Sequence, residues 1–151
     1  DTVFDNLPED MPRVVSVGRL DITSEGLLLF TNSGKLAEKL SLPQNNFVRI
    51  YKVRARGLNN VALNAIDYIN QGAIVPGINA KPIKITILTD GNYNNWFEVK
   101  LSEGKNREIR KLFEYMHLEV NRLIRIQFAS FKLGNMQPGE IQEVQISEDL
   151  L

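Results

Sequence analysis

The alternation of apolar and polar residues along the chain predicts several β-strands. Residues 14–17 form a short apolar run, and residues 27–30 form a continuous one that suits a strand buried on both faces. Residues 47–55 alternate with a period of two, which is typical of a strand with one buried face. Further strands that the same pattern predicts lie at residues 74–75, 83–87, 97–101 and 124–128.

A period near 3.6 residues predicts three helices among these strands. The first extends through Leu40 after an N-terminal cap at Asn32 or Ser33, and the second begins at Asn59 or Asn60 with Leu63 on its apolar face. The third covers residues 106–116, where apolar side chains recur at helical spacing. Strands and helices do not alternate regularly, so we expect an α+β domain with a mixed, mainly antiparallel sheet flanked by a few helices.

The composition limits the kinds of site that the chain can carry. At 151 residues it fits one domain, and 43% hydrophobic and 24% charged residues are typical of a soluble globular protein. Cysteine is absent and His117 is the single histidine, so disulfides and thiolate metal sites are excluded. With no signal peptide and no apolar run of the ~20 residues that a membrane helix needs, we expect a cytoplasmic protein without structural metal.

The charges are distributed unevenly although the net charge is zero. Residues 49–56 carry four basic side chains and no acidic one, and residues 104–125 carry six basic against three acidic side chains. Acidic residues gather at the two ends of the chain. Because phosphate binding depends on the local field and not on the net charge, the two basic segments fit an RNA-binding face, and a solvated charged surface fits them equally well.

The loop predicted at residues 18–26 is the strongest candidate for chemistry. It places Asp21 two positions after Arg19, between two apolar strands. A carboxylate in such a loop can act as a nucleophile or a general base, and a nearby cation keeps it ionised. The simpler alternative is that Asp21 only accepts hydrogen bonds from the backbone of the turn, as aspartate often does.

The candidate loop belongs to a series of segments that runs through the chain. These segments are VGRLD at 17–21, SEGLLL at 24–29, TNSG at 31–34, YKV at 51–53, EGKNREIRK at 103–111, VNRLIR at 120–125 and the glycines and proline of 134–139. In sequence and in order they resemble the motifs of bacterial ribosomal RNA pseudouridine synthases, in the branch that acts on small-subunit and large-subunit rRNA. The resemblance spans about residues 2–144.

The resemblance implies the family's catalytic fold, which is consistent with the α+β expectation, and its reaction. In that family the aspartate, here Asp21, attacks the ribose of the target uridine or removes a proton from it. The bond between sugar and base then breaks, and the freed uracil rejoins the sugar through carbon, without metal or cofactor. The target base must first leave its stack. The sequence favours the large-subunit branch through the segments NREIR and NRLIR.

The resemblance also implies roles for individual residues. Arg19 helps to flip the nucleotide, Tyr51 stacks on the uracil, and Arg110 pairs with Asp21 and keeps it ionised. Each has a simpler alternative: Tyr51 shares its strand face with apolar neighbours, as a core residue does, and Arg110 lies off the apolar stripe of its helix, as a solvated residue does. The predicted RNA-binding residues are Arg19, Lys52, Lys105, Arg107, Arg122 and Arg125.

The chain departs from the family pattern at its front. The S4-like RNA-binding domain that usually precedes these motifs does not precede residue 1, and an early strand motif is missing before residues 2–5. We therefore expect residues 1–151 to form an N-terminally truncated catalytic domain, monomeric, with ribosomal RNA or a ribosomal assembly intermediate as its partner. Two other functions stay open: a non-catalytic RNA-binding or ribosome-assembly module on the same fold, and a protein-interaction domain.

Overall fold

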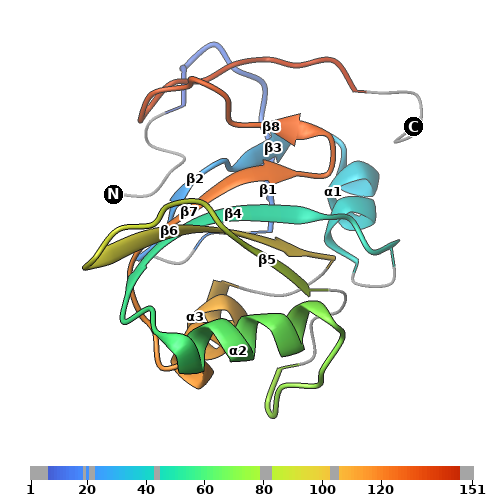
Figure 1. Cartoon of the computed structure of the whole chain (residues 1–151). Coiled ribbons are helices and arrows are strands. Elements are labelled where there is room, and N and C mark those ends of the chain that lie inside the picture. Colours follow the sequence, from blue (N-terminus) through green and yellow to red (C-terminus); the bar gives the residue numbers. More distant parts are fainter. Residues whose placement is uncertain are drawn as a thin grey trace.

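A computed structural model describes residues 7–18, 20, 23–42, 45–78, 83–102 and 106–146 of the chain. These residues form eight strands and three helices (Figure 1). In chain order the elements are β1 (Val15–Val17), β2 (Glu25–Gly26), β3 (Leu29–Thr31), α1 (Gly34–Ser41), β4 (Arg49–Arg56), α2 (Asn60–Asn70), β5 (Ile83–Ile87), β6 (Asn94–Leu101), α3 (Asn106–Tyr115), β7 (Glu119–Phe128) and β8 (Phe131–Lys132).

The larger sheet of the described residues has the strand order β2-β7-β4-β6-β5, with β8 also paired to β7. Strand β2 runs parallel to β7, and the other pairs are antiparallel. A mixed, mainly antiparallel sheet flanked by a few helices is therefore confirmed. Strands β1 and β3 form a separate antiparallel pair beside α1.

The main core fills the space between one face of the larger sheet and helices α2 and α3, which lie together below the sheet in Figure 1. Alternate residues of β4, namely Tyr51, Val53 and Ala55, point into it. From α3, Phe113 packs edge-on against Phe97 of β6 with the ring centroids 5.2 Å apart. A second core joins α1 to β1 and to the far end of β7 at Phe128.

The caps of the first two helices follow the sequence prediction. Ser33 accepts a hydrogen bond from the Leu36 backbone nitrogen at 3.2 Å, and Asn59 accepts one from that of Ala62 at 3.0 Å. Each side chain satisfies a backbone donor that the first helical turn leaves unpaired. The buried face of α2 uses Ala62, whereas Leu63, predicted on that face, is exposed.

The apolar run at residues 27–30 does not form one buried strand. The Leu27 nitrogen donates to the Arg125 carbonyl oxygen at 2.8 Å, so Leu27 continues the contact of β2 with β7. Strand β3 starts only at Leu29, pairs with β1 and is partly buried. The run is thus divided between two sheets, and the predicted loop at 18–26 contains β2.

Three other segments differ from the predicted strands. Residues 74–75 do not form a strand: Val75 is buried beside α2, but Ile74 is 72% exposed. The two-residue strand β8 has no counterpart in the prediction. Strand β7 begins earlier than predicted, at Glu119, and it buries Arg125 while Ile124 is only partly covered. The connection between β5 and β6 is longer than a two-residue turn and covers residues 88–93.

Candidate active site

The segment Thr23–Leu27, which begins two residues after Asp21 in the sequence, is fixed to strand β7. Glu25 lies opposite Ile124 and Gly26 opposite Arg125 in the parallel β2–β7 pair. Gly26 has φ of 108°, a conformation that favours glycine. A Cβ atom there would lie 2.7 Å from the Arg125 nitrogen and closer still to its carbonyl oxygen. Only glycine lets the two backbones approach so closely.

Arg125 holds this segment from the inner side of the sheet. Its side chain is only 3% exposed, and its Nε donates to the Leu27 carbonyl oxygen at 2.9 Å. Burial lowers the pKa of the guanidinium, and a hydrogen bond to the Tyr51 hydroxyl and the charge of that group act in the opposite direction. The buried Nη2 atom has no hydrogen-bond partner among the described residues. This burial argues against the predicted RNA contact of Arg125.

Tyr51 lies directly opposite Arg125 in the antiparallel β4–β7 pair. It is 1% exposed and belongs to the main core, as do Val53 and Ala55 on the same face of the strand. Its hydroxyl is nevertheless directed to Arg125, so one end of the side chain packs in the core and the other reaches the group that holds Leu27. The structure thus brings together two of the residues predicted for the site.

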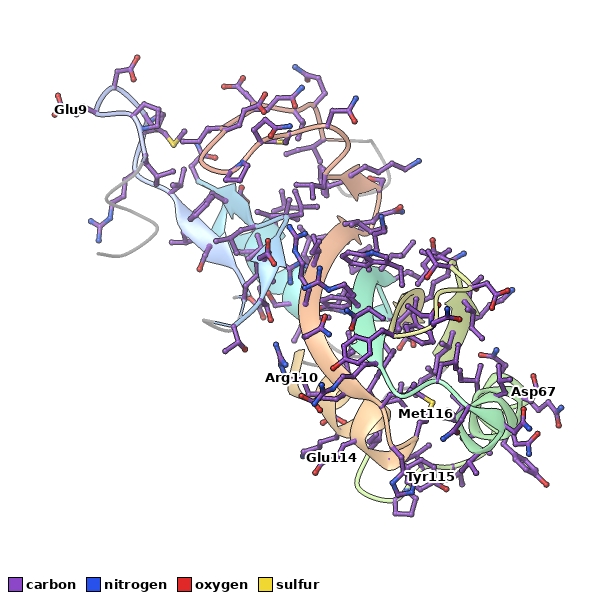
Figure 2. The ribbon with its side chains drawn as sticks, turned by 60° about the vertical axis from the view of Figure 1, so that its left-hand side comes forward. Glu9, Asp67, Arg110, Glu114, Tyr115 and Met116 are labelled. Atoms are coloured by element: carbon purple, nitrogen blue, oxygen red, sulfur yellow. The ribbon has the colours of Figure 1, made fainter. Side chains whose placement is uncertain are left out.

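Arg110 reaches the same segment from α3. Its Nη2 donates to the Thr23 carbonyl oxygen at 3.1 Å, across 87 positions of sequence. Its buried Nε atom has no hydrogen-bond partner among the described residues. In Figure 2 the side chain of Arg110 extends from α3 alongside β7. The alternative that Arg110 is merely solvated on its helix does not fit this contact.

Arg122 holds the segment from the outer side of the sheet. Its Nε and Nη2 donate to the two carboxylate oxygens of Glu25 at 2.9 and 3.0 Å. The hydrogen bond from Arg122, aided by the charges of Arg122 and Arg54, lowers the pKa of Glu25 against a smaller opposing effect of burial. The same bond raises the pKa of Arg122. The predicted RNA-binding residue Arg122 therefore already has a bidentate partner.

Of the other predicted residues, Lys52 lies on another face of the sheet, and the rest are not described in full. Lys52 lies on the opposite face of β4 from Tyr51, with its Nζ 4.8 Å from the centre of the Trp96 ring. Arg19, Asp21 and Lys105 lie outside the described residues, and Arg107 belongs to α3 with its side chain outside the described part. Their predicted roles stay predictions.

Sequence reasoning gave no role of their own to three residues, Ser24 and Gly26 of this segment and Glu108 of α3. Gly26 was placed only in a loop, although a glycine beside a candidate catalytic loop signals a close backbone approach. Ser24 Oγ and Glu108 Oε2 are buried, with no hydrogen-bond partner among the described residues. Both residues lie in the matching motifs, but the motifs do not show that these atoms are buried, because burial of one atom depends on contacts between distant segments.

The arrangement favours an anionic group near the Thr23–Leu27 segment. Three arginines from α3 and β7 contact a stretch of five residues, and two of them carry an unsatisfied buried nitrogen. Such cations keep a carboxylate ionised and stabilise negative charge that develops in a reaction. The described residues contain no cluster of His, Cys, Asp or Glu suited to a metal ion, and none of their helices has the length and apolar character for a membrane crossing.

Comparison with known proteins assigns this arrangement to a family. The sequence model of the RNA pseudouridylate synthase family matches residues 4–115. The chain belongs to this family. A Rickettsia felis protein named as an uncharacterized RNA pseudouridine synthase is 50% identical over 143 residues, which cover 95% of this chain. A ribosomal large subunit pseudouridine synthase B of Haemophilus influenzae is 43% identical over 159 residues, covering 99% of this chain.

A solved structure supports the fold of this pseudouridine synthase family member. The crystal structure of a pseudouridylate synthase superposes with a TM-score of 0.77 over 92% of the chain, at 24% identity. The chain spans 61% of the length of the Rickettsia felis relative, 43% of the Haemophilus influenzae relative and 60% of the solved chain. The resemblance stated from the motifs is confirmed at the level of family and fold.

Proposed function

We propose that this chain is the catalytic domain of an enzyme that converts a uridine of ribosomal RNA into pseudouridine, with Asp21 as the attacking residue. The observation that carries the proposal is the hydrogen bond from Arg110 to Thr23, because it ties the α3 motif to the segment that follows Asp21. A binding module needs basic residues for phosphates, but it does not need arginines gathered around a segment that begins beside a carboxylate.

The proposed reaction is an isomerisation in which no atom is gained or lost. The target nucleotide leaves its stack, and the Asp21 carboxylate attacks the ribose or removes a proton from it, so that the bond between C1′ and N1 breaks. The freed uracil turns and forms a bond from C5 to C1′; this step displaces Asp21 from the sugar if the carboxylate attacked, or is accompanied by return of the proton from Asp21 to the ribose if it acted as a base. The proton on C5 is then removed and N1 ends protonated, which restores the electron count.

Arg110 and Tyr51 complete the proposed machinery. Arg110 pairs with Asp21 through the guanidinium nitrogens that Thr23 does not use, and keeps the carboxylate ionised. Tyr51 stacks on the uracil and assists the final removal of the proton, which requires that its ring, 1% exposed in this structure, is uncovered when RNA binds. Arg125 acts as a positioning residue, because it is buried between Tyr51 and Leu27 and contacts both.

The proposed substrate is large-subunit ribosomal RNA, as free RNA or within an assembly intermediate, and so we place the protein in the cytoplasm. Two relatives at 43% identity are named as ribosomal large subunit pseudouridine synthase B, which supports this choice of subunit. We further propose that Arg19, Lys52, Lys105 and Arg107 contact the RNA backbone, that no cofactor takes part, and that the protein acts as a monomer.

The test maps pseudouridine in ribosomal RNA from cells that lack the gene. The cells are complemented with the full-length protein, with Asp21→Asn, or with Asp67→Asn as a matched control, since Asp67 is an exposed carboxylate on α2. We expect one site to disappear without the gene and to return with the wild type and Asp67→Asn only.

Two results would count against the proposal. If Asp21→Asn restores the site, Asp21 is not the attacking residue. If every pseudouridine persists without the gene, and purified protein binds ribosomal RNA without modifying it, the non-catalytic RNA-binding module on the same fold becomes the better description.

A further inference from the structure

The outer face of the larger sheet carries a tryptophan among basic side chains. This face consists of the strand residues that alternate with the main core, so it lies opposite α2 and α3 (Figure 1). Across three neighbouring strands, Trp96 of β6 lies opposite Arg54 of β4, and Arg54 lies opposite Arg122 of β7. We call Trp96, Arg54, Arg122 and the adjacent Lys52 the Trp96 face.

The cations of the Trp96 face gather over one ring. Lys52 Nζ lies 4.8 Å from the centre of the Trp96 ring, Arg54 Cζ lies 5.8 Å from it, and Arg122 Cζ lies 5.9 Å from it. Each distance is within the range of a cation–π interaction. The ring itself is partly exposed, so part of its surface is open to another molecule.

Carboxylates do not neutralise this group fully. Glu25 pairs with Arg122, but neither Lys52 nor Arg54 forms an ion pair with a carboxylate of the described residues. Glu98 lies opposite Lys52 in the β4–β6 register and is instead 3.8 Å from Lys100 Nζ. Two basic side chains that share one ring repel each other, and an anion bound between them would relieve that repulsion.

Arg54 is held in a fixed orientation by neutral groups. Its Nε donates to Asn121 Oδ1 at 2.6 Å, and Asn121 Nδ2 donates to Asn94 Oδ1 at 2.7 Å. This chain of amides fixes the plane of the guanidinium and leaves its charge in place. A planar cation and an aromatic ring that are both oriented in advance are suited to a flat ligand with an adjacent negative charge.

We propose that the Trp96 face binds a single-stranded segment of the RNA, with one base stacked on Trp96 and the adjoining phosphates in contact with Lys52 and Arg54. Aromatic rings and arginine planes on an open sheet bind unpaired bases, and basic side chains follow the backbone. This surface is separate from the Tyr51 site, which lies on the other face of β4. The choice of RNA as the ligand rests on the proposed function.

The Trp96 face is connected to the candidate active site through one ion pair. Arg122 belongs to this face and also holds Glu25, four residues after Asp21 in the sequence. RNA bound to the Trp96 face would therefore pass close to the anchored Thr23–Leu27 segment. The Trp96 face would increase the affinity of the protein for RNA and orient the bound RNA, without taking part in the reaction.

The test uses the single tryptophan of the chain as its reporter, since Trp96 is the only one in the sequence. Its fluorescence is titrated with a 12-nucleotide oligouridylate at several salt concentrations, with N-acetyltryptophanamide as the control for absorption by the RNA. Anisotropy of a labelled oligouridylate gives the affinity separately. We expect quenching that saturates together with the anisotropy, in the wild type and in Asp21→Asn alike.

Variants measure the two parts of the contact. Replacing Trp96 by leucine should weaken binding roughly tenfold, because stacking on one base is lost. Arg54→Gln should lower the slope of log K against log salt by about 0.7, the value for one contact to a single-stranded phosphate. Lys35→Gln, an exposed charge at the start of α1, is the matched control and should change neither. Circular dichroism and thermal unfolding check that each variant is folded.

Three results would overturn the proposal. Oligouridylate that binds by anisotropy without changing Trp96 fluorescence would show that RNA uses another surface. Unchanged affinity in folded Trp96→Leu would show the same. Quenching by a polyglutamate peptide but not by RNA would identify the face as a site for an acidic protein. Because quenching needs no turnover, it separates this proposal from the fate of the proposed reaction.

Discussion

The two faces of strand β4 differ in how they are held. On the inner face Tyr51 and Val53 are almost completely buried, and their environment is the apolar core beneath α2 and α3. On the outer face Arg54 and Arg56 are held by rings, amides and a carboxylate at the surface. One strand thus separates a face that stabilises the fold from a face that carries charged side chains.

The candidate active site lies where these two faces meet at the edge of β7. Arg122 and Arg125 are three positions apart on one strand, so their side chains point to opposite faces. The first holds Glu25 from outside, and the second holds Leu27 from inside. The segment after Asp21 therefore depends on both faces, and changes on each should affect it to different degrees.

The largest effect is expected on the inner face, from Phe113→Ala. This ring is completely buried against Phe97, so its removal should cost about 3–5 kcal/mol of unfolding free energy. Tyr115→Ala on the same helix is the control, because Tyr115 is 50% exposed and should change stability by less than about 0.5 kcal/mol. Urea unfolding measures both. Equal losses would mean that the main core is not where the stability lies.

Gly26→Ala tests the edge where the faces meet. The positive φ alone should cost about 1–3 kcal/mol, and the clash with the Arg125 backbone should add to it. Gly72→Ala is matched, since Gly72 has φ of 98° but open space around it. Pseudouridine formation should fall in Gly26→Ala by more than the loss of unfolding free energy accounts for. Identical unfolding curves for the two variants would contradict the close approach of Gly26 to the Arg125 backbone.

A smaller effect is expected on the outer face, from Arg56→Gln. Arg56 donates to Glu119 Oε2 at 2.6 Å and to the Tyr93 hydroxyl at 2.6 Å, but the pair is exposed. Exposed ion pairs contribute less than about 1 kcal/mol, and salt screens them. Thermal unfolding at low and high salt should show a shift that shrinks as salt rises. A loss as large as that of Phe113→Ala would break the comparison between the faces.

The smallest effect is a pH dependence that comes from Glu25. Its pKa is lower in the folded protein than the ordinary value of 4.5, so the folded state binds the proton less readily than the unfolded chain. The pair with Arg122 therefore stabilises the fold above about pH 4.5, and this stability is lost as the pH falls through the lowered pKa. Glu25→Gln should reduce the acid-induced loss slightly, as measured by unfolding between pH 3 and pH 6. A larger acid loss in the variant would contradict the assigned sign.

Much of this fold was predictable because its central elements are long and periodic. The alternation of β4 placed Tyr51 inside and Lys52 outside, and helical spacing gave α3 with its buried Phe113. The errors concern elements whose existence depends on a distant partner. Strand β2 has two residues, too few for a period, and it forms because β7 offers it a parallel edge.

The sequence named residues of the candidate site but did not give the contacts between them. The motifs pointed to Tyr51, Arg110 and Arg125, but Arg125 was predicted to bind RNA because it belongs to the basic segment 104–125. Its burial follows from the register that places it opposite Tyr51 and from the carbonyl oxygen of Leu27 that accepts its hydrogen bond. A sequence pattern gives neither of these, because both join segments far apart in the chain.

The docking of Leu27 on Arg125 also has a consequence for synthesis of the protein. The two residues are 98 positions apart, so the ribosome needs roughly 5–20 s after making the first to make the second, at about 5–20 residues per second. During that interval the residues of α1, β4 and α2 are synthesised, but the segment that follows Asp21 does not yet have β7 to dock on. The segment that follows Asp21 is therefore anchored only after β7 has been synthesised.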